Sequence, residues 1–188
     1  MAPVYSSYVC IFISTLFMLM VASSHVNTAA VTSTAILVTV DQSGNGDYEK
    51  IQDIINAVPS DNRELVFIRV KPGIYKEKII MPADKLFITI SGSKANGTII
   101  TWNDSGEIFE SPTFTMLASD FVGRYLTIQD TLLDDTGRHY YKSCYIEGAV
   151  DFIFGNAASL FKMCHLHSLS EGDAAITAQR RQSPSEDT

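Results

Sequence analysis

The sequence predicts an all-β fold, a right-handed parallel β-helix (solenoid) with an N-terminal capping helix and with C-terminal coils missing. Three features predict it. Similar segments recur at intervals of 20 to 21 residues, short β-branched segments alternate with Gly, Pro, Asn and Asp turns, and one amphipathic helical segment precedes them. Each coil of such a solenoid buries its apolar side on the next coil, so residues one period apart lie on adjacent rungs about 4.8 Å apart.

The first element is an apolar leader, residues 1–30, which contains no Lys, Arg, Asp or Glu. Its apolar run, residues 9–22, is short for a membrane span and is followed by small residues, as is typical of a secretory signal peptide. The usual positive charge at the start is absent, so an uncleaved N-terminal anchor stays open as the alternative. We expect cleavage between Ala22 and Ala30, with residues 31–188 forming one secreted domain.

The next element is a helix that ends before Pro59. Ile51, Ile54, Ile55 and Val58 fall at the i, i+3, i+4, i+7 spacing of an amphipathic helix. The preceding Gly-Asn-Gly turn lacks the third glycine and the βαβ alternation of a nucleotide-binding loop. We therefore expect the helix to cover the open end of the solenoid, where a bare terminal coil would expose strand edges.

The periodic segments come after the helix. The pairs are 65–70 with 86–91 at an offset of 21, 125–128 with 145–148 at an offset of 20, and 144–147 with 164–167 at an offset of 20. The same spacing relates Asp130 to Asp151 and Cys144 to Cys164. We therefore expect the two carboxylates on adjacent rungs, with their side chains on the same outward face.

Asp151 lies in an apolar run, between Val150 and Phe152. A carboxylate in such a run is costly to desolvate unless it is paired or its charge is used. It could simply cap the turn at Gly155-Asn156, but a second carboxylate one period away favours a chemical role. Two close carboxylates can act together when their surroundings keep one ionised and the other protonated.

These residues resemble a known family. The run from Ile146 to Gly155, IEGAVDFIFG, and the Gln-Asp-Thr-Leu stretch from Gln129 to Leu132 resemble the motifs of the pectinesterases, the pectin methylesterases of plant cell walls. The resemblance implies that Asp151 is the nucleophile, Asp130 the proton donor and later the base, and Gln129 an oxyanion donor. It implies methyl-esterified polygalacturonan (pectin) as the substrate, and neither a metal nor an organic cofactor.

The sequence departs from the family pattern at two places. In the family another coil, bearing a first glutamine, separates the Thr-Ile-Gln strand from the Gln-Asp-Thr-Leu motif, whereas here Gln129 belongs to both. The chain also ends before the family's Leu-Gly-Arg-Pro-Trp segment, and Arg180 and Arg181 come too early to replace it. The alternative is therefore a catalytically impaired fragment that binds the wall or has no activity. A polysaccharide lyase is a weaker third reading, because no calcium cluster is visible.

The net charge and the cysteine content indicate which partners and which cellular compartment to expect. A formal charge of −7 without a basic run excludes a typical nucleic-acid-binding protein and favours a neutral, esterified stretch of polyuronate over an ionised one. Cys10 lies in the leader, and the remaining pair, Cys144 and Cys164, favours a disulfide over a metal site. Two glycosylation sequons begin at Asn96 and Asn103. We expect an extracellular, cell-wall monomer without stable membrane association.

Overall fold

The computed structural model describes residues 35–102, 111–181 and 183. The chain divides into residues 1–32 and 33–188, and every described helix and strand lies in the second part. The predicted leader, residues 1–30, and the sequon at Asn103 lie outside the described residues. None of the described helices is long and apolar enough to cross a membrane.

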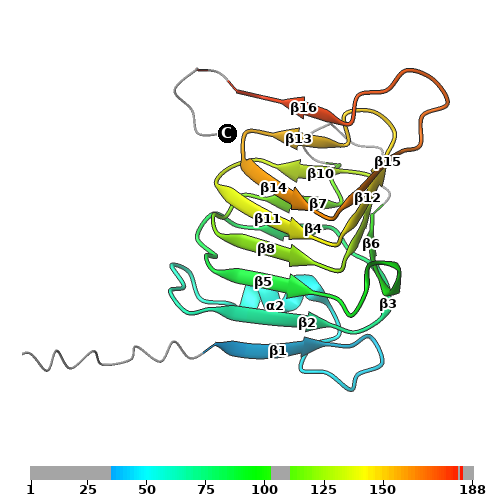
Figure 1. The fold of residues 1–188 in the computed structure, drawn as a ribbon. Coiled ribbons are helices and arrows are strands. Elements are labelled where there is room, and N and C mark those ends of the chain that lie inside the picture. Colours follow the sequence, from blue (N-terminus) through cyan, green and yellow to red (C-terminus); the bar gives the residue numbers. More distant parts are fainter. Residues whose placement is uncertain (1–34, 103–110, 182, 184–188) are drawn as a thin grey trace, which may run out of the picture. The chain divides into compact units, whose positions relative to one another are not determined.

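Parallel strands form three sheets that stack coil upon coil (Figure 1). Sheet A contains β1 (Ile36–Val40), β2 (Val66–Val70), β5 (Ile88–Ser91), β8 (Phe121–Arg124), β11 (Arg138–Lys142) and β14 (Ala158–Lys162). Sheet B contains β3 (Gly73–Lys76), β6 (Thr98–Thr101), β9 (Thr127–Gln129), β12 (Tyr145–Gly148) and β15 (His165–Ser168). Sheet C contains β4 (Ile79–Met81), β7 (Phe114–Met116), β10 (Leu132–Asp134), β13 (Ile153–Gly155) and β16 (Thr177–Gln179).

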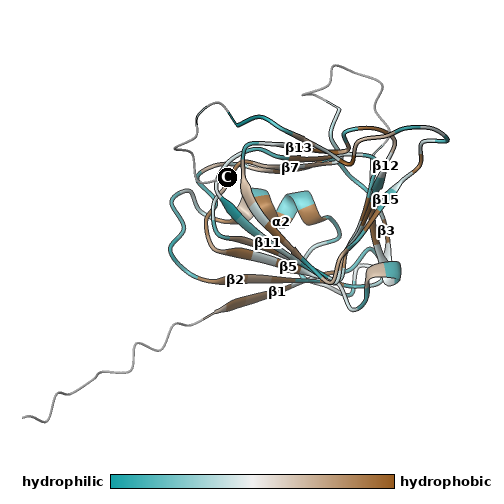
Figure 2. Ribbon diagram, turned by 45° about the horizontal axis from the view of Figure 1, so that its top comes forward, coloured by the Kyte–Doolittle hydropathy of each residue, from teal (hydrophilic) through white to brown (hydrophobic). Residues whose placement is uncertain are grey.

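The chain visits the three sheets in the same order in every coil. From β2 to β16 each successive strand belongs to A, then B, then C, and each strand pairs with its counterpart in the next coil in parallel. Seen toward the end of the stack, the three sheets enclose one interior (Figure 2). This arrangement confirms the predicted parallel β-helix.

The predicted coil offsets are correct in one case and wrong in two. Tyr145 pairs with His165, as the offset of 20 requires. However, Val66 pairs with Ile88, an offset of 22 instead of 21, and Thr127 pairs with Tyr145, an offset of 18 instead of 20. The corners between strands vary in length and many contain a residue with positive φ, such as Phe87 at 58°. Sequence similarity between strands does not reveal how many residues each corner contains. One extra corner residue shifts the pairing register of the strand that follows.

The predicted capping helix is present as α2, residues Ile51–Ala57. Ile51, Ile54 and Ile55 are buried, and the helix lies across the N-terminal end of the solenoid interior (Figure 2). The Glu77 carboxylate accepts hydrogen bonds from the backbone N–H groups of Ile51 at 3.2 Å and Gln52 at 3.0 Å. This satisfies two of the unpaired donors that every helix has at its start, and it ties the cap to the first coil.

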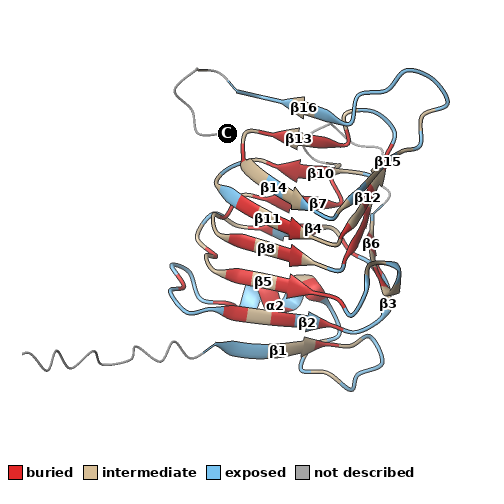
Figure 3. Ribbon diagram, viewed as in Figure 1, coloured by how far each residue is buried: buried red, intermediate tan, exposed pale blue. Residues whose placement is uncertain are grey.

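The core consists of inward-facing side chains stacked in columns. In sheet B the register places Ile100, Ile128, Ile146 and Leu166 directly above one another. The three isoleucines are fully buried, whereas Leu166 in the last described coil is only half-buried. Figure 3 shows the same change along the whole stack, from buried strands in the middle to exposed residues in β16.

A buried polar cluster interrupts the apolar interior near β10. Asp134 accepts hydrogen bonds from Tyr141 Oη at 2.9 Å and from the Ser159 hydroxyl, and its Oδ1 lies 2.5 Å from His139 Nδ1. The other ring nitrogen, Nε2, lies 2.7 Å from the Ala118 carbonyl oxygen. Both ring nitrogens therefore face acceptors, which suits a protonated imidazole that pairs with the Asp134 carboxylate.

The predicted disulfide is not formed in this structure, where Cys144 and Cys164 are free thiols. Their sulfur atoms interact with backbone carbonyls instead, Cys144 Sγ with Gly123 O at 3.7 Å and Cys164 Sγ with Tyr141 O at 3.4 Å. The two residues nevertheless occupy the same corner of successive coils. A hydrogen bond from the Cys144 thiol lowers the pKa of Cys164 to about 7, while the same bond and burial raise the pKa of Cys144.

Candidate active site

The candidate catalytic residues lie where the chain turns from sheet B into sheet C. Asp130 follows β9 directly, and Asp151 lies in the corresponding corner between β12 and β13. On one side of these corners Gln129 pairs with Glu147, and on the other side Leu132 pairs with Ile153. The two aspartates therefore belong to the same corner of successive coils. The offset grows from 18 to 21 residues across this corner, so the Asp151 corner is three residues longer.

Both aspartates have a left-handed backbone conformation, with φ of 82° at Asp130 and 50° at Asp151. Aspartate is among the few residues with a side chain that tolerate this region, and such conformations are concentrated at functional sites. Gly148 makes the approach of the two corners possible. A Cβ on Gly148 would lie 2.1 Å from the Asp130 carbonyl oxygen and 2.3 Å from Phe152 Cβ, so no larger residue fits.

Asp130 lies in a hollow of about 240 Å³. The other residues that line it are Trp102, Ser111, Thr131, Ala149, Val150 and Phe152. Burial, and then the negative charge of Glu147, raise the pKa of Asp130 above its usual range. A carboxyl group with a raised pKa keeps its proton longer and is suited to donate it to a leaving group.

Asp151 is held differently from Asp130. Its neighbours Val150 and Phe152 line the hollow, but Asp151 itself does not. Its backbone N–H donates a 2.8 Å hydrogen bond to the Ala175 carbonyl of the next coil. The structure therefore brings the two corners together, but it leaves the Asp151 side chain outside the hollow that contains Asp130.

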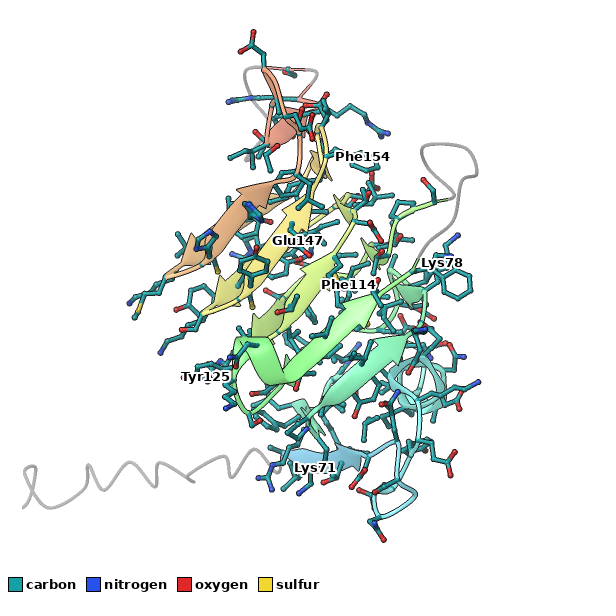
Figure 4. All side chains as sticks on the ribbon, turned by 90° about the vertical axis from the view of Figure 1, so that its right-hand side faces the viewer. Lys71, Lys78, Phe114, Tyr125, Glu147 and Phe154 are labelled. Atoms are coloured by element: carbon teal, nitrogen blue, oxygen red, sulfur yellow. The ribbon has the colours of Figure 1, made fainter. Side chains whose placement is uncertain are left out.

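Gln129 faces a second hollow, of about 440 Å³, on the outer face of sheet B. Its Nε2 donates a hydrogen bond to Glu147 Oε1 at 2.7 Å, and Figure 4 shows Glu147 on this face of β12. The amide to which the family resemblance assigns an oxyanion role is thus bound to a carboxylate. This contact is the main difference between the predicted site and the observed one.

Glu147 belongs to a small network that the sequence did not predict. Its Oε2 lies 3.4 Å from His167 Nδ1, which lies 2.6 Å from the Tyr145 hydroxyl. Burial would raise the pKa of Glu147, but hydrogen bonds from Gln129, Tyr145 and His167 lower it overall. Glu147 is opposite Gln129 in the observed register, so an offset of 18 instead of 20 would have indicated this pair.

The remaining polar candidates lie away from these two hollows. Arg180 Nη2 lies 4.0 Å from Asp135 Oδ1, at a different corner of the coil. Within the described ranges, no group of three His, Cys, Asp or Glu side chains is placed to hold a metal ion.

Trp102 and Ser111 line the Asp130 hollow but were not predicted from the sequence. The sequence between them contains no strand signal that fixes their place.

The sequence profile described as Pectinesterase matches residues 37–131 and 125–188. The chain belongs to the pectinesterase family. A relative from Arabidopsis thaliana, named as a pectinesterase (number 11), is 50% identical over an alignment that covers 82% of this chain and 53% of the relative. Pectinesterase 31 of the same plant is 36% identical, with 83% of this chain and 63% of the relative covered.

Solved structures agree with this assignment. A pectin methylesterase from carrot superposes with a TM-score of 0.68 at 28% identity, covering 80% of this chain and 59% of that chain. A pectin methylesterase from Aspergillus niger gives 0.61 at 27% identity, covering 80% and 62%. The chain therefore spans between about half and two thirds of the length of these pectinesterases.

The comparison with the family profile shows the same departure at Gln129, where two family motifs share one residue. The family profile matches residues 125–131 twice, at the end of its first segment and at the start of its second. The first relative aligns over 186 positions with 82% of this 188-residue chain, about 154 residues, so about 30 of its positions have no counterpart here. Coil offsets in this structure range from 18 residues, between Thr127 and Tyr145, to 35 residues, between Ile79 and Phe114. The difference therefore equals about one coil.

Proposed function

We propose that this chain acts as a pectinesterase, a carboxylic ester hydrolase that removes methyl esters from pectin. The Asp151 carboxylate attacks the methyl-ester carbonyl of a galacturonate unit, and an acyl-enzyme forms as the C–O bond to methoxide breaks. Asp130 gives its proton to the departing methanol. It then takes a proton from the incoming water, which hydrolyses the acyl-enzyme and regenerates the Asp151 carboxylate.

The observation that carries this proposal is the state of Asp130. It lies in an open hollow with Trp102 at its border, in the corner next to that of Asp151. Its raised pKa favours the protonated form that the first step requires. Membership in the family supports the same division of roles between the two aspartates.

Methanol release from methyl-esterified polygalacturonan by the purified chain tests the proposal. Asp151→Asn keeps the side-chain shape and removes the nucleophile, so release should fall to background while the circular dichroism spectrum stays unchanged. Asp135→Asn, at a different corner of the coil, is the matched control and should keep wild-type release. Methanol release that is above background and equal in wild type and Asp151→Asn would refute the assigned nucleophile.

One observation favours the second candidate, a catalytically impaired wall-binding fragment. The Gln129 amide donates to Glu147 at 2.7 Å, so it is not available to an oxyanion in this arrangement. Loss of one oxyanion donor costs about 3–4 kcal/mol of transition-state stabilisation. A folded wild-type chain that binds pectin in a pull-down but releases no methanol would support this second candidate over the first.

The proposal includes secretion to the cell wall after removal of residues 1–30, and a monomer without stable membrane association. In that oxidising compartment we expect Cys144 and Cys164 to form a disulfide, because they occupy the same corner of successive coils. A loop of this size contributes about 3 kcal/mol in the chain-entropy treatment. Alkylation of secreted protein without reductant, followed by intact-mass measurement, should label neither cysteine; labelling of both would contradict the bond.

A further inference from the structure

We propose that Asn96 is an N-glycosylation site, modified by an N-linked oligosaccharide at the edge of the hollow that contains Gln129. Asn96, Gly97 and Thr98 form an Asn-x-Thr acceptor sequence. Asn96 is exposed in the short 3₁₀ turn η1 (Ala95–Gly97), directly before β6. The inference rests on the proposed secretion, because the sugar donor occurs only in the secretory pathway.

The Asn96 side chain is available for modification. In the described part of the chain no hydrogen bond holds its amide, whereas the turn itself is fixed by backbone contacts. The Gly97 N–H donates to the Lys94 carbonyl at 3.0 Å, and the Thr127 hydroxyl donates to the Ala95 carbonyl at 3.0 Å. A rigid turn thus presents an unengaged amide toward solvent.

Thr98 provides an independent second observation. It is completely buried, and its Oγ1 has no hydrogen-bond partner among the described residues. A buried hydroxyl without a partner destabilises a fold, and valine has the same shape without this penalty. The folded protein therefore gives no reason for a hydroxyl at position 98. Recognition of the Asn-x-Thr acceptor sequence by the glycosylation enzyme, before β6 joins the sheet, does explain the hydroxyl.

The modification is a group transfer from a lipid-linked oligosaccharide diphosphate. A bond forms between Asn96 Nδ2 and the anomeric carbon of the first N-acetylglucosamine. The bond from that carbon to the diphosphate oxygen breaks, the lipid diphosphate leaves, and the amide nitrogen loses one proton. Since Thr98 is inaccessible in the folded chain, the transfer has to precede folding of this coil.

The attached sugar would occupy a defined place. Asn96 lines the 440 Å³ hollow together with Gln129, Tyr145 and Glu147. The first sugar would therefore lie over β6 and β9 on the outer face of sheet B. Asn96 precedes β6 and Asp130 follows β9, so the sugar and Asp130 would lie toward opposite ends of the sheet B strands.

Translation of the full chain in the presence of endoplasmic-reticulum vesicles tests the site, and gel mobility before and after endoglycosidase digestion is the readout. We expect a protease-protected chain with a digestible mobility shift. Asn96→Gln and Thr98→Val should each lose one oligosaccharide, whereas Thr98→Ser, which keeps the acceptor sequence, should retain it. Asn103→Gln removes the other sequon and should leave the Asn96 shift in place.

Two outcomes overturn the site, and both are distinct from a failure of secretion. A protected chain that shows no shift attributable to Asn96, or a shift that survives in Thr98→Val, refutes it. A chain that stays protease-sensitive refutes the proposed secretion instead. In that case the same variants behind a secretion leader of known function decide the site. In addition, unglycosylated Thr98→Val should unfold at no lower denaturant concentration than the unglycosylated wild type.

Discussion

The second coil and the last described coil of the solenoid have the same three-sheet plan, but they differ greatly in burial. Ile88 and Ile90 in β5 are almost fully buried, whereas no residue of β14, β15 or β16 is buried. These three strands are the outermost members of their sheets. The opposite end is covered by α2, which closes the interior there (Figure 3).

The difference shows where the stability of a strand in this fold originates. Phe161 of β14 stacks on Tyr141 of the preceding coil, with ring centroids 4.9 Å apart and planes 6° from parallel. Tyr141 is fully buried and Phe161 is not, although both point inward. A side chain in a solenoid is therefore sealed by the coil that follows it, and nearest-neighbour contacts dominate the energetics.

The largest effect that would test this comparison is expected at Asp134, which connects the buried strand β11 to the last described coil. It binds Tyr141 and His139 in the well-packed part and Ser159 in β14. Asp134→Ala leaves these buried partners unpaired and should reduce the free energy of unfolding by about 3–5 kcal/mol. Urea denaturation measures this. Asp135→Ala loses a contact with Arg180 at 4.0 Å and an exposed 2.9 Å hydrogen bond from the Thr136 hydroxyl, and should change it by less than about 0.5 kcal/mol.

The second-largest effect is expected within one column of sheet B, between a position in the middle of the stack and one in the last described coil. Ile128→Ala creates a cavity at a fully buried position and should cost about 2–5 kcal/mol. Leu166→Ala truncates a half-buried side chain in the same column and should cost less than half as much. Parallel urea titrations of both variants give the ratio. Equal losses would mean that the last described coil is sealed by contacts outside the described residues.

The smallest effect is the pH dependence of the polar cluster. Burial alone lowers the pKa of His139, but the hydrogen bond and the charge of Asp134 raise it overall. Since the folded-state pKa exceeds the unfolded value of about 6.5, the stabilisation is complete below that pH and is lost as the pH rises through the folded-state pKa. His139→Gln should flatten the stability profile above pH ~6.5, as measured by thermal unfolding across the range. An unchanged profile would exclude His139 as its origin.

Most of the fold could be predicted from the sequence because its elements depend on local patterns. The spacing of Ile51, Ile54 and Ile55 determines a helix, and α2 is found at that place. The alternation of short strands and turns was enough to indicate a solenoid. The register was only partly predictable, because corner residues such as Phe87 and Tyr125, with φ of 58° and 54°, add length without a pattern of their own.

For the candidate site, the sequence predicted that Asp130 and Asp151 lie on adjacent coils, but it did not predict the contacts around them. The corner that Asp130 and Asp151 share follows from the strand pairing, and this was expected. The bond from Gln129 to Glu147 was not, because it depends on an offset of 18 that sequence similarity obscured. The contribution of Trp102 to the Asp130 hollow likewise follows from a long connection between β6 and β7. Such contacts require the three-dimensional stack.

The two matched segments of the family profile overlap around Gln129. This overlap indicates that whole coils can be added to or removed from this fold. The chain passes from β9 to β10 through Asp130 and Thr131 only, and both strands still pair correctly with the coils before and after them. Adding or removing one whole coil therefore leaves the inward-facing and outward-facing positions of every strand unchanged. A module of about 30 residues from a relative, grafted between β9 and β10, should therefore leave the pairing of the strands on either side intact.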